Sequence, residues 1–147
     1  MTEVKRMKDK AFIDTNIIIY MQSATEADKQ LIARQVLDSF DCVASTQVLN
    51  EVSNVLVKKA GFSYEQIGRI IDGLIQVCDI MVVTCDTIRN AHSIAETYSI
   101  GYYDSLIVSS AVESDCKYLL SEDLTDGQKI NDSITIINIF DHPEFFD

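Results

Sequence analysis

The sequence predicts an α/β fold in which helices cover both faces of a parallel sheet. Short runs rich in apolar and β-branched residues alternate with longer stretches of helical periodicity along most of the chain. Such alternation implies right-handed crossovers, which place the strands parallel to one another and the helices on both faces. The 147 residues, 47% hydrophobic with five glycines and one proline, fit one compact domain. We therefore expect a single three-layer α/β/α domain over residues 1–147, with residues 1–9 as a frayed tail.

Five segments are predicted to be strands, and the first of them to be central. They read AFID, CVAS, IMVVT, KYLLS and SITIINI, at residues 11–14, 42–45, 80–84, 117–121 and 133–139. The first is apolar at nearly every position, as expected for a strand that is buried on both faces.

The segments between the strands begin with residue types that start helices. The apolar residues after Asn16 are expected to start the first helix. The other predicted helices are 26–40 opened by Thr25, 46–60 capped by Ser45 and ended by Gly61, 64–77 opened by Ser63 with Gln66, 87–99 capped by Asp86, and 104–115 beginning at Asp104.

Composition excludes several classes of protein. The net charge of -11 argues against a broad electrostatic footprint on nucleic acid, which needs clustered Lys and Arg. No segment approaches the ~18 consecutive apolar residues of a membrane helix, and no secretory signal is visible. Cys42, Cys78, Cys85 and Cys116 are widely spaced and form no C-x-x-C, which favours buried reduced thiols over a zinc site. We expect a cytoplasmic protein with no membrane partner.

Acidic residues follow several of the predicted strands. In a parallel α/β sheet, ligands bind beyond the carboxyl ends of the strands. Asp14 lies at such an end, and Glu122 and Asp123 follow another, while Asp104 begins the preceding helix. Glu51 lies about two turns into the helix after CVAS, from where it can lean back toward the strand ends. Acids from four separate places are therefore predicted to converge on one edge.

Convergent carboxylates repel one another unless a cation compensates their charge. Oxygen ligands without His or Cys select a hard ion such as Mg²⁺ or Mn²⁺. Such an ion can lower the pKa of a bound water and neutralise charge on phosphoryl oxygens. The pattern therefore predicts metal-assisted chemistry on a phosphate.

Four motifs resemble those of the PIN domain ribonucleases, and in particular of the VapC-type toxins of toxin-antitoxin pairs. The motifs are FIDTNIIIY with its D-T-N, STQVLNEVSNVL with a helical Glu, YYDSLIVSSA with its D-x-x-I-x-x-x-A pattern, and LLSEDL. Their order and spacing are kept from about Ala11 to Phe140. Each motif is weak alone, whereas the four in sequence are a strong signal.

The resemblance implies a PIN-like five-stranded parallel sheet in the order 3-2-1-4-5. It also implies Mg²⁺-dependent cleavage of single-stranded RNA by metal-activated water, which leaves 5′-phosphate and 3′-hydroxyl ends. It further implies a small antitoxin partner and a homodimer, for which the helices at 31–40 and 48–57 could supply the interface.

By the same resemblance, four acids would bind the metal and carry catalysis: Asp14, Glu51, Asp104 and Asp123. Asn16 and Ser121 would orient ligands or water. The S-E-D turn departs from the single acid of many relatives, so the resemblance leaves open whether Glu122 joins the site.

Each of these residues also has a plain structural interpretation. Asp14 and Asp104 can cap helices, Glu51 can be an ordinary exposed helix residue, and Asp123 and Asp126 can be loop acids. Tyr102 and Tyr103 can stack on bases or belong to a core or an interface. Two other functional classes remain: a catalytically silent binding module or partner-sequestered scaffold, and a phosphotransfer or receiver domain, which the absence of D-x-D disfavours.

Overall fold

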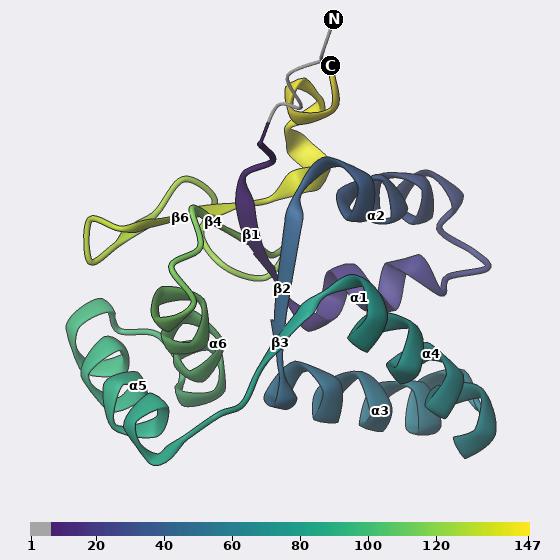
Figure 1. Ribbon diagram of the computed structural model, residues 1–147, viewed down its shortest axis with the longest axis horizontal. Coiled ribbons are helices and arrows are strands. Elements are labelled where there is room, and N and C mark those ends of the chain that lie inside the picture. The colour runs from purple at the N-terminus through teal and green to yellow at the C-terminus, as the bar shows by residue number, and fades with distance from the viewer. Residues whose placement is uncertain (1–6) are drawn as a thin grey trace, which may run out of the picture.

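The computed structural model describes residues 7–147 as a sheet covered by helices on both faces (Figure 1). In chain order the elements are β1 (Lys10–Ile13), α1 (Thr15–Met21), α2 (Ala27–Ser39), β2 (Asp41–Ser45), α3 (Thr46–Ala60), α4 (Tyr64–Val77), β3 (Asp79–Met81), α5 (Cys85–Tyr98), α6 (Tyr102–Glu113), β4 (Tyr118–Leu120), β5 (Lys129–Ile130) and β6 (Ile134–Ile137), followed by short 3-10 helices at Ile139–Asp141 and Pro143–Phe146. Helices α5 and α6 lie on one side of β1 and β2, and α1 to α4 lie on the other (Figure 1). The predicted α/β class and its three layers are confirmed.

The sheet has six strands in the order β3-β2-β1-β4-β6-β5. The five predicted strands are β1, β2, β3, β4 and β6, all parallel and in the expected order. The predicted count of five was wrong, because β5 pairs with β6 in the antiparallel direction. With only two residues, β5 is too short to show the alternation by which a strand is recognised in a sequence.

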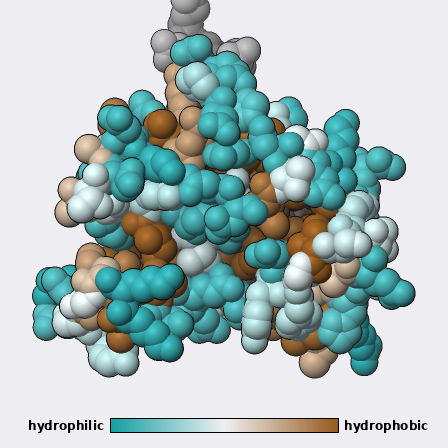
Figure 2. Space-filling model, turned by 180° about the vertical axis from the view of Figure 1, so that it is seen from behind, coloured by the Kyte–Doolittle hydropathy of each residue, from teal (hydrophilic) through white to brown (hydrophobic). Residues whose placement is uncertain are grey.

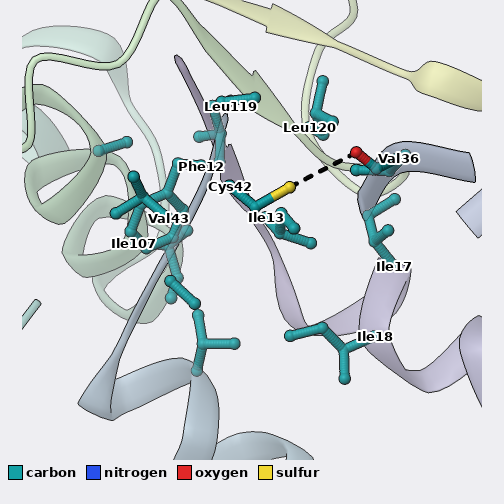
Figure 3. Packing of buried hydrophobic residues seen from close by; sticks show 14 of the residues in the cluster. Phe12, Ile13, Ile17, Ile18, Val36, Cys42, Val43, Ile107, Leu119 and Leu120 are labelled. Atoms are coloured by element: carbon teal, nitrogen blue, oxygen red, sulfur yellow. Dashed lines mark hydrogen bonds between the residues drawn. The ribbon is translucent and has the colours of Figure 1, made fainter. Parts of the chain in front are cut away.

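The central position of β1 is confirmed, since it pairs with β2 on one side and β4 on the other. Its residues Ala11, Phe12 and Ile13 have no exposed surface. Successive side chains of a strand point to opposite faces. Figure 3 accordingly shows Phe12 beside Ile107 of α6, and Ile13 on the other face, toward α1. Side chains of β1 therefore pack against the helices on both faces of the sheet.

Several predicted helix boundaries are confirmed. The hydroxyl of Ser45 accepts a hydrogen bond from the Val48 N–H and caps α3. Ser63 and Gln66 form the predicted capping box of α4. Gly61 ends α3 in the left-handed conformation, with φ of 66°.

Three predicted helix starts were wrong, and one of them is that of α6, which begins at Tyr102 rather than at Asp104. Helix α2 has Glu26 rather than Thr25 at its N-cap, and the hydroxyl of Ser23 accepts hydrogen bonds from the N–H groups of both residues. Helix α5 is capped by Thr84 with Thr87, which places Asp86 inside the first turn. Thr84 rather than Asp86 is the N-cap because Thr87, three residues later, completes a capping box with it.

The remaining expectations concern the termini, the cysteines and membrane spans. Of the predicted tail, residues 1–6 lie outside the described part of the chain, and Met7–Asp9 form neither helix nor strand. Cys42, Cys78 and Cys116 are buried as predicted, but Cys85 is exposed as the first residue of α5. None of the helices in residues 7–147 is long and apolar enough to cross a bilayer.

Two glycines provide a matched test of the backbone. Gly61→Ala is expected to lower the free energy of unfolding by about 1 to 2 kcal/mol, because a Cβ is disfavoured at positive φ. Gly68→Ala in α4 is expected to raise it by about 0.5 to 1 kcal/mol, because alanine favours a helix interior. A Cβ at either position meets no atom within 4 Å, so crowding affects neither variant. Urea unfolding of both would measure the difference, and equal values would contradict the left-handed cap.

Candidate active site

An open cleft of about 500 Å³ lies at the carboxyl ends of β1 and β4. These two strands are parallel neighbours, but the strand order reverses between them. The strands β2 and β3 continue the sheet on the far side of β1, and β6 continues it on the far side of β4. Such a reversal of strand order opens a crevice in which α/β proteins bind their ligands. The cleft is lined by all four predicted acids, Asp14, Glu51, Asp104 and Asp123, and also by Glu122. The structure thus brings together the carboxylates that the sequence placed at separate strand and helix ends.

Asp14 forms the floor of the cleft and is only 6% exposed. It directly follows β1 and caps α1, because its Oδ1 accepts a hydrogen bond of 2.7 Å from the Thr15 N–H. Its Oδ2 accepts a bond of 2.8 Å from the Ser121 hydroxyl. Burial raises the pKa of Asp14 to about 6, the hydrogen bonds from Ser121 and Thr15 oppose this, and the charges of Glu51 and Asp104 add to it. The structural role as a cap and the place in the acidic cleft therefore coexist.

Asn16 and Ser121 connect the ends of β1 and β4. The Asn16 amide nitrogen donates to Asp123 Oδ2 at 3.0 Å and to Ser121 Oγ at 3.4 Å, while its oxygen accepts from the Glu122 N–H. Ser121 Oγ also accepts from the Asp123 N–H at 3.2 Å. These bonds fix the S-E-D turn against the start of α1, with Asp123 facing the cleft.

Glu51 reaches the cleft from α3. Its carboxylate accepts a hydrogen bond of 2.6 Å from the Thr15 hydroxyl and one of 3.3 Å from the Gln47 amide. The D-T-N sequence after β1 therefore supplies one acid, Asp14, and bonds to two others, since Thr15 contacts Glu51 and Asn16 contacts Asp123. The bond from Thr15 to Glu51 was not predicted from the sequence.

Asp104 lies in the first turn of α6, two residues after the helix begins. The N-cap is Gly101, so the interpretation of Asp104 as an N-cap was wrong. Partial burial raises the pKa of Asp104, and the charges of Asp123 and Glu51 raise it further. This shared effect shows that the three carboxylates lie close enough to interact.

Glu122 lies at the side of the cleft and is already paired. Its carboxylate accepts hydrogen bonds from Lys29 Nζ at 2.5 Å and from the Tyr20 hydroxyl at 2.6 Å. Burial acts to raise the pKa of Glu122, but the bonds from Lys29 and Tyr20 outweigh it and lower that pKa. Lys29 also lies 4.7 Å from the centre of the Tyr20 ring. Nothing near Glu122 in the sequence indicated Tyr20 or Lys29 as its partners.

Asp126 belongs to a different contact. It is not among the residues that line the cleft, and its carboxylate accepts from the Asn138 N–H and contacts His142. The structural interpretation of this loop acid is therefore correct.

The donor set of the cleft fits a hard divalent cation. Asp14, Glu51, Asp104 and Asp123 present carboxylate oxygens, and among the described residues Lys59 is the only basic residue in the lining. Within residues 7–147 no three His, Cys, Asp or Glu side chains are already placed to hold a metal ion. Burial is the main cause of the raised pKa of Asp14, and the charges of Glu51 and Asp104 add to it, so a cation in the cleft would favour the ionised form. Carboxylate oxygens favour Mg²⁺ or Mn²⁺.

Comparison with known proteins identifies the fold. Residues 11–125 match the family model of the PIN domain. A toxin-antitoxin complex from Klebsiella pneumoniae has a similar chain, with a TM-score of 0.67 and 21% identity over 88% of this chain and 97% of that one. VapC20 of Mycobacterium tuberculosis, a sarcin-ricin loop cleaving toxin, gives a TM-score of 0.64 and 16% identity over 77% and 91%. VapBC2 of Rickettsia felis, bound to a promoter DNA fragment, gives 0.63 and 17% identity over 86% and 96%.

A search of curated protein sequences gives no significant match. The family match alone covers most of the chain and contains all four motif regions, from β1 to the turn after β4. The structural similarities extend over nearly the whole length of the compared chains. The expected family is thereby confirmed, and the chain belongs to the PIN domain family.

Proposed function

We propose that this protein is a Mg²⁺- or Mn²⁺-dependent endoribonuclease that hydrolyses single-stranded RNA, and that it is the toxin of a type II toxin-antitoxin pair. One observation carries the proposal: four carboxylates from four different elements line one cleft, and the most buried of them has a pKa raised to about 6. The PIN domain, which we take to extend over residues 1–147 as a single unit, provides the frame.

Asp14, Glu51, Asp104 and Asp123 would hold the cation. When bound, a divalent ion supplies a lowered pKa for water and positive charge opposite the phosphoryl oxygens. Asn16 and Ser121 orient Asp123, Ser121 also orients Asp14, and Thr15 orients Glu51. No histidine lines the cleft among residues 7–147, so carboxylates are the available proton acceptors there.

An RNA substrate is consistent with the charge of the cleft only when a cation is present. Without one, the carboxylates would repel a phosphodiester, and Lys59 alone would not offset them. The preference for an unpaired strand is taken from the family resemblance. By the family resemblance, the products carry 5′-phosphate and 3′-hydroxyl ends.

The same acidity suits an antitoxin that approaches with Arg or Lys side chains. Several similar solved structures are complexes of a toxin with its antitoxin, which supports such a partner. The four free cysteines support a location in the reducing cytoplasm.

A homodimer is part of the proposal. The face seen in Figure 2 is mostly hydrophilic, with apolar patches between the polar residues. Leu31, in one of the two helices expected at the interface, is 63% exposed, and Ile75 and Val77 of α4 are also exposed. Such residues are available to be covered by a second copy.

The proposal is tested with purified protein and end-labelled single-stranded RNA. We expect cleavage with Mg²⁺ or Mn²⁺, no cleavage with EDTA, and products that a 5′-phosphate-dependent exonuclease degrades. An absence of cleavage with every divalent ion, together with calorimetry that detects no ion binding, would instead favour the silent binding module.

A further inference from the structure

A second hollow adjoins the acidic cleft and has a different chemistry. It has a volume of about 330 Å³ and is lined by Gln47, Asn50, Glu51, Asn54 and Tyr103; we call it the amide pocket. Glu51 and Asn54 line both this pocket and the cleft, so the two adjoin each other. Whatever occupies the amide pocket therefore lies next to the proposed metal ligands.

One wall of the amide pocket is a polar stripe on α3. Gln47, Asn50, Glu51 and Asn54 follow the spacing i, i+3, i+4 and i+7, which places them on one face of the helix. The Glu51 carboxylate is already hydrogen-bonded to the Thr15 hydroxyl and the Gln47 amide. Asn50 and Asn54 are exposed, and each offers both donors and acceptors.

Tyr103, at the start of α6, also lines the pocket. Its side chain is 65% exposed, which is high for an aromatic residue beside a cleft. Its ring packs edge-on against Tyr102 with the centroids 5.3 Å apart, and Tyr102 in turn lies 5.5 Å from His92. Most of the surface of Tyr103 is therefore free to stack on another ring.

The residues that line the amide pocket indicate which kind of ligand it can bind. Among the described residues no Lys or Arg lines the pocket, and Glu51 would repel an anion, so the occupant is not a phosphate group. An exposed aromatic face with neighbouring amides is instead what proteins offer to unpaired bases, which stack and hydrogen-bond along their edges. The hollow, of about 330 Å³, is large enough to accept one flat base.

We propose that the amide pocket binds one unpaired nucleobase of the nucleotide beside the scissile phosphate, stacked on Tyr103 and hydrogen-bonded by Asn50 and Asn54. This inference rests on the proposed function for the identity of the strand, but its binding test is independent of cleavage. The amide pocket would provide the nuclease with a contact to a base, in addition to the contacts of the acidic cleft with the phosphate.

The test uses a short single-stranded RNA with one 2-aminopurine, titrated with the full chain carrying Asp14→Asn. Stacking on Tyr103 is expected to quench the 2-aminopurine fluorescence. Adding Tyr103→Ala is expected to abolish the quenching and to weaken binding about tenfold, within the range of base–aromatic stacking. Tyr103→Phe, which keeps the ring, should behave like the parent, as should Tyr64→Ala, which removes an exposed tyrosine from α4.

A second measurement uses the protein with Asp14 intact. Tyr103→Ala is expected to raise KM for the RNA about tenfold with kcat unchanged, because stacking acts equally in the ground state and the transition state. Quenching that depends on Tyr103 in a protein that cuts no RNA would support the pocket and refute the nuclease. Unchanged quenching and KM in Tyr103→Ala, with RNA still cut, would refute the pocket and leave the nuclease standing. Loss of self-association in Tyr103→Ala with unchanged RNA parameters would also refute it, and would identify this face as a contact between two copies.

Discussion

Asp14→Asn is expected to abolish RNA cleavage while making the divalent-free protein more stable. Even residues that only support metal ligands reduce activity about 10- to 100-fold when changed, so loss of a ligand at the floor of the cleft should cost at least about 100-fold. Asparagine keeps the oxygen that accepts from the Thr15 N–H and caps α1. The loss of activity would therefore come from the missing charge rather than from a broken helix start.

The gain in stability follows from the raised pKa of Asp14. A folded-state value of about 6, against an ordinary value of 3.8, means that the folded protein binds the proton more tightly than the unfolded chain. Without a cation, stability therefore falls as the pH rises from about 4 to about 6, and it stays low above that range. The difference corresponds to about 3 kcal/mol at neutral pH. The Asp14→Asn variant should recover about 1 to 2 kcal/mol of this, since an amide fits the donating Ser121 hydroxyl less well than a carboxylate does.

Urea unfolding in EDTA between pH 4 and pH 8 would measure this effect. The parent should lose stability across the lower half of the range, whereas the Asp14→Asn curve should be flatter. Asp72→Asn is a matched control, because it removes the same charge from an exposed position on α4. If Asp14→Asn were less stable than the parent at pH 7, burial of the Asp14 carboxylate would not destabilise the fold. If it cut RNA at the parent's rate, the assignment of the cleft would fail.

The sequence was sufficient for the features that depend on local pattern. A strand that is apolar at nearly every position is expected to be buried on both faces, and β1 is central in agreement with this. The caps of α3 and α4 depend on residues three positions apart, so they are visible in the sequence. The convergence of the acids also follows from local order, because parallel strands end at one edge of the sheet.

The features that could not be predicted depend on distant contacts or on competition between neighbours. The partners of Glu122 lie about a hundred residues away in α1 and α2, and only the folded chain brings Lys29 over the ring of Tyr20. Thr84 and Asp86 are both good capping residues, and the choice between them depends on the partner that Thr87 supplies. Strand β5 exists because the turn after it folds back on β6, which no two-residue pattern can reveal.

Asn16→Asp is expected to be nearly as harmful to activity as the loss of an acid, although it adds a carboxylate to an acidic site. The two side chains have almost the same shape, but the substitution replaces the donating amide nitrogen with a second acceptor. Asp123 Oδ2, now 3.0 Å from that nitrogen, would face a negative oxygen, and Ser121 Oγ would lose a donor. The bond from the Glu122 N–H would remain, because it uses the oxygen common to both residues. We therefore expect the S-E-D turn to stay attached to α1 while Asp123 is displaced from the cleft.

Comparison with Asn16→Ala separates repulsion from the loss of a hydrogen bond. Asn16→Asp should lower kcat/KM about 10- to 100-fold at a fixed Mg²⁺ concentration, and Asn16→Ala should lower it less, because alanine removes the donor without adding charge. In EDTA at pH 7, Asn16→Asp should also lower the free energy of unfolding by about 1 to 3 kcal/mol. That deficit should shrink as the pH falls, because protonation of the introduced carboxylate ends the repulsion and restores a donor. If alanine proved as harmful as aspartate at every pH, the amide would act only as a spacer, and the orientation of Asp123 would have to depend on Ser121 alone.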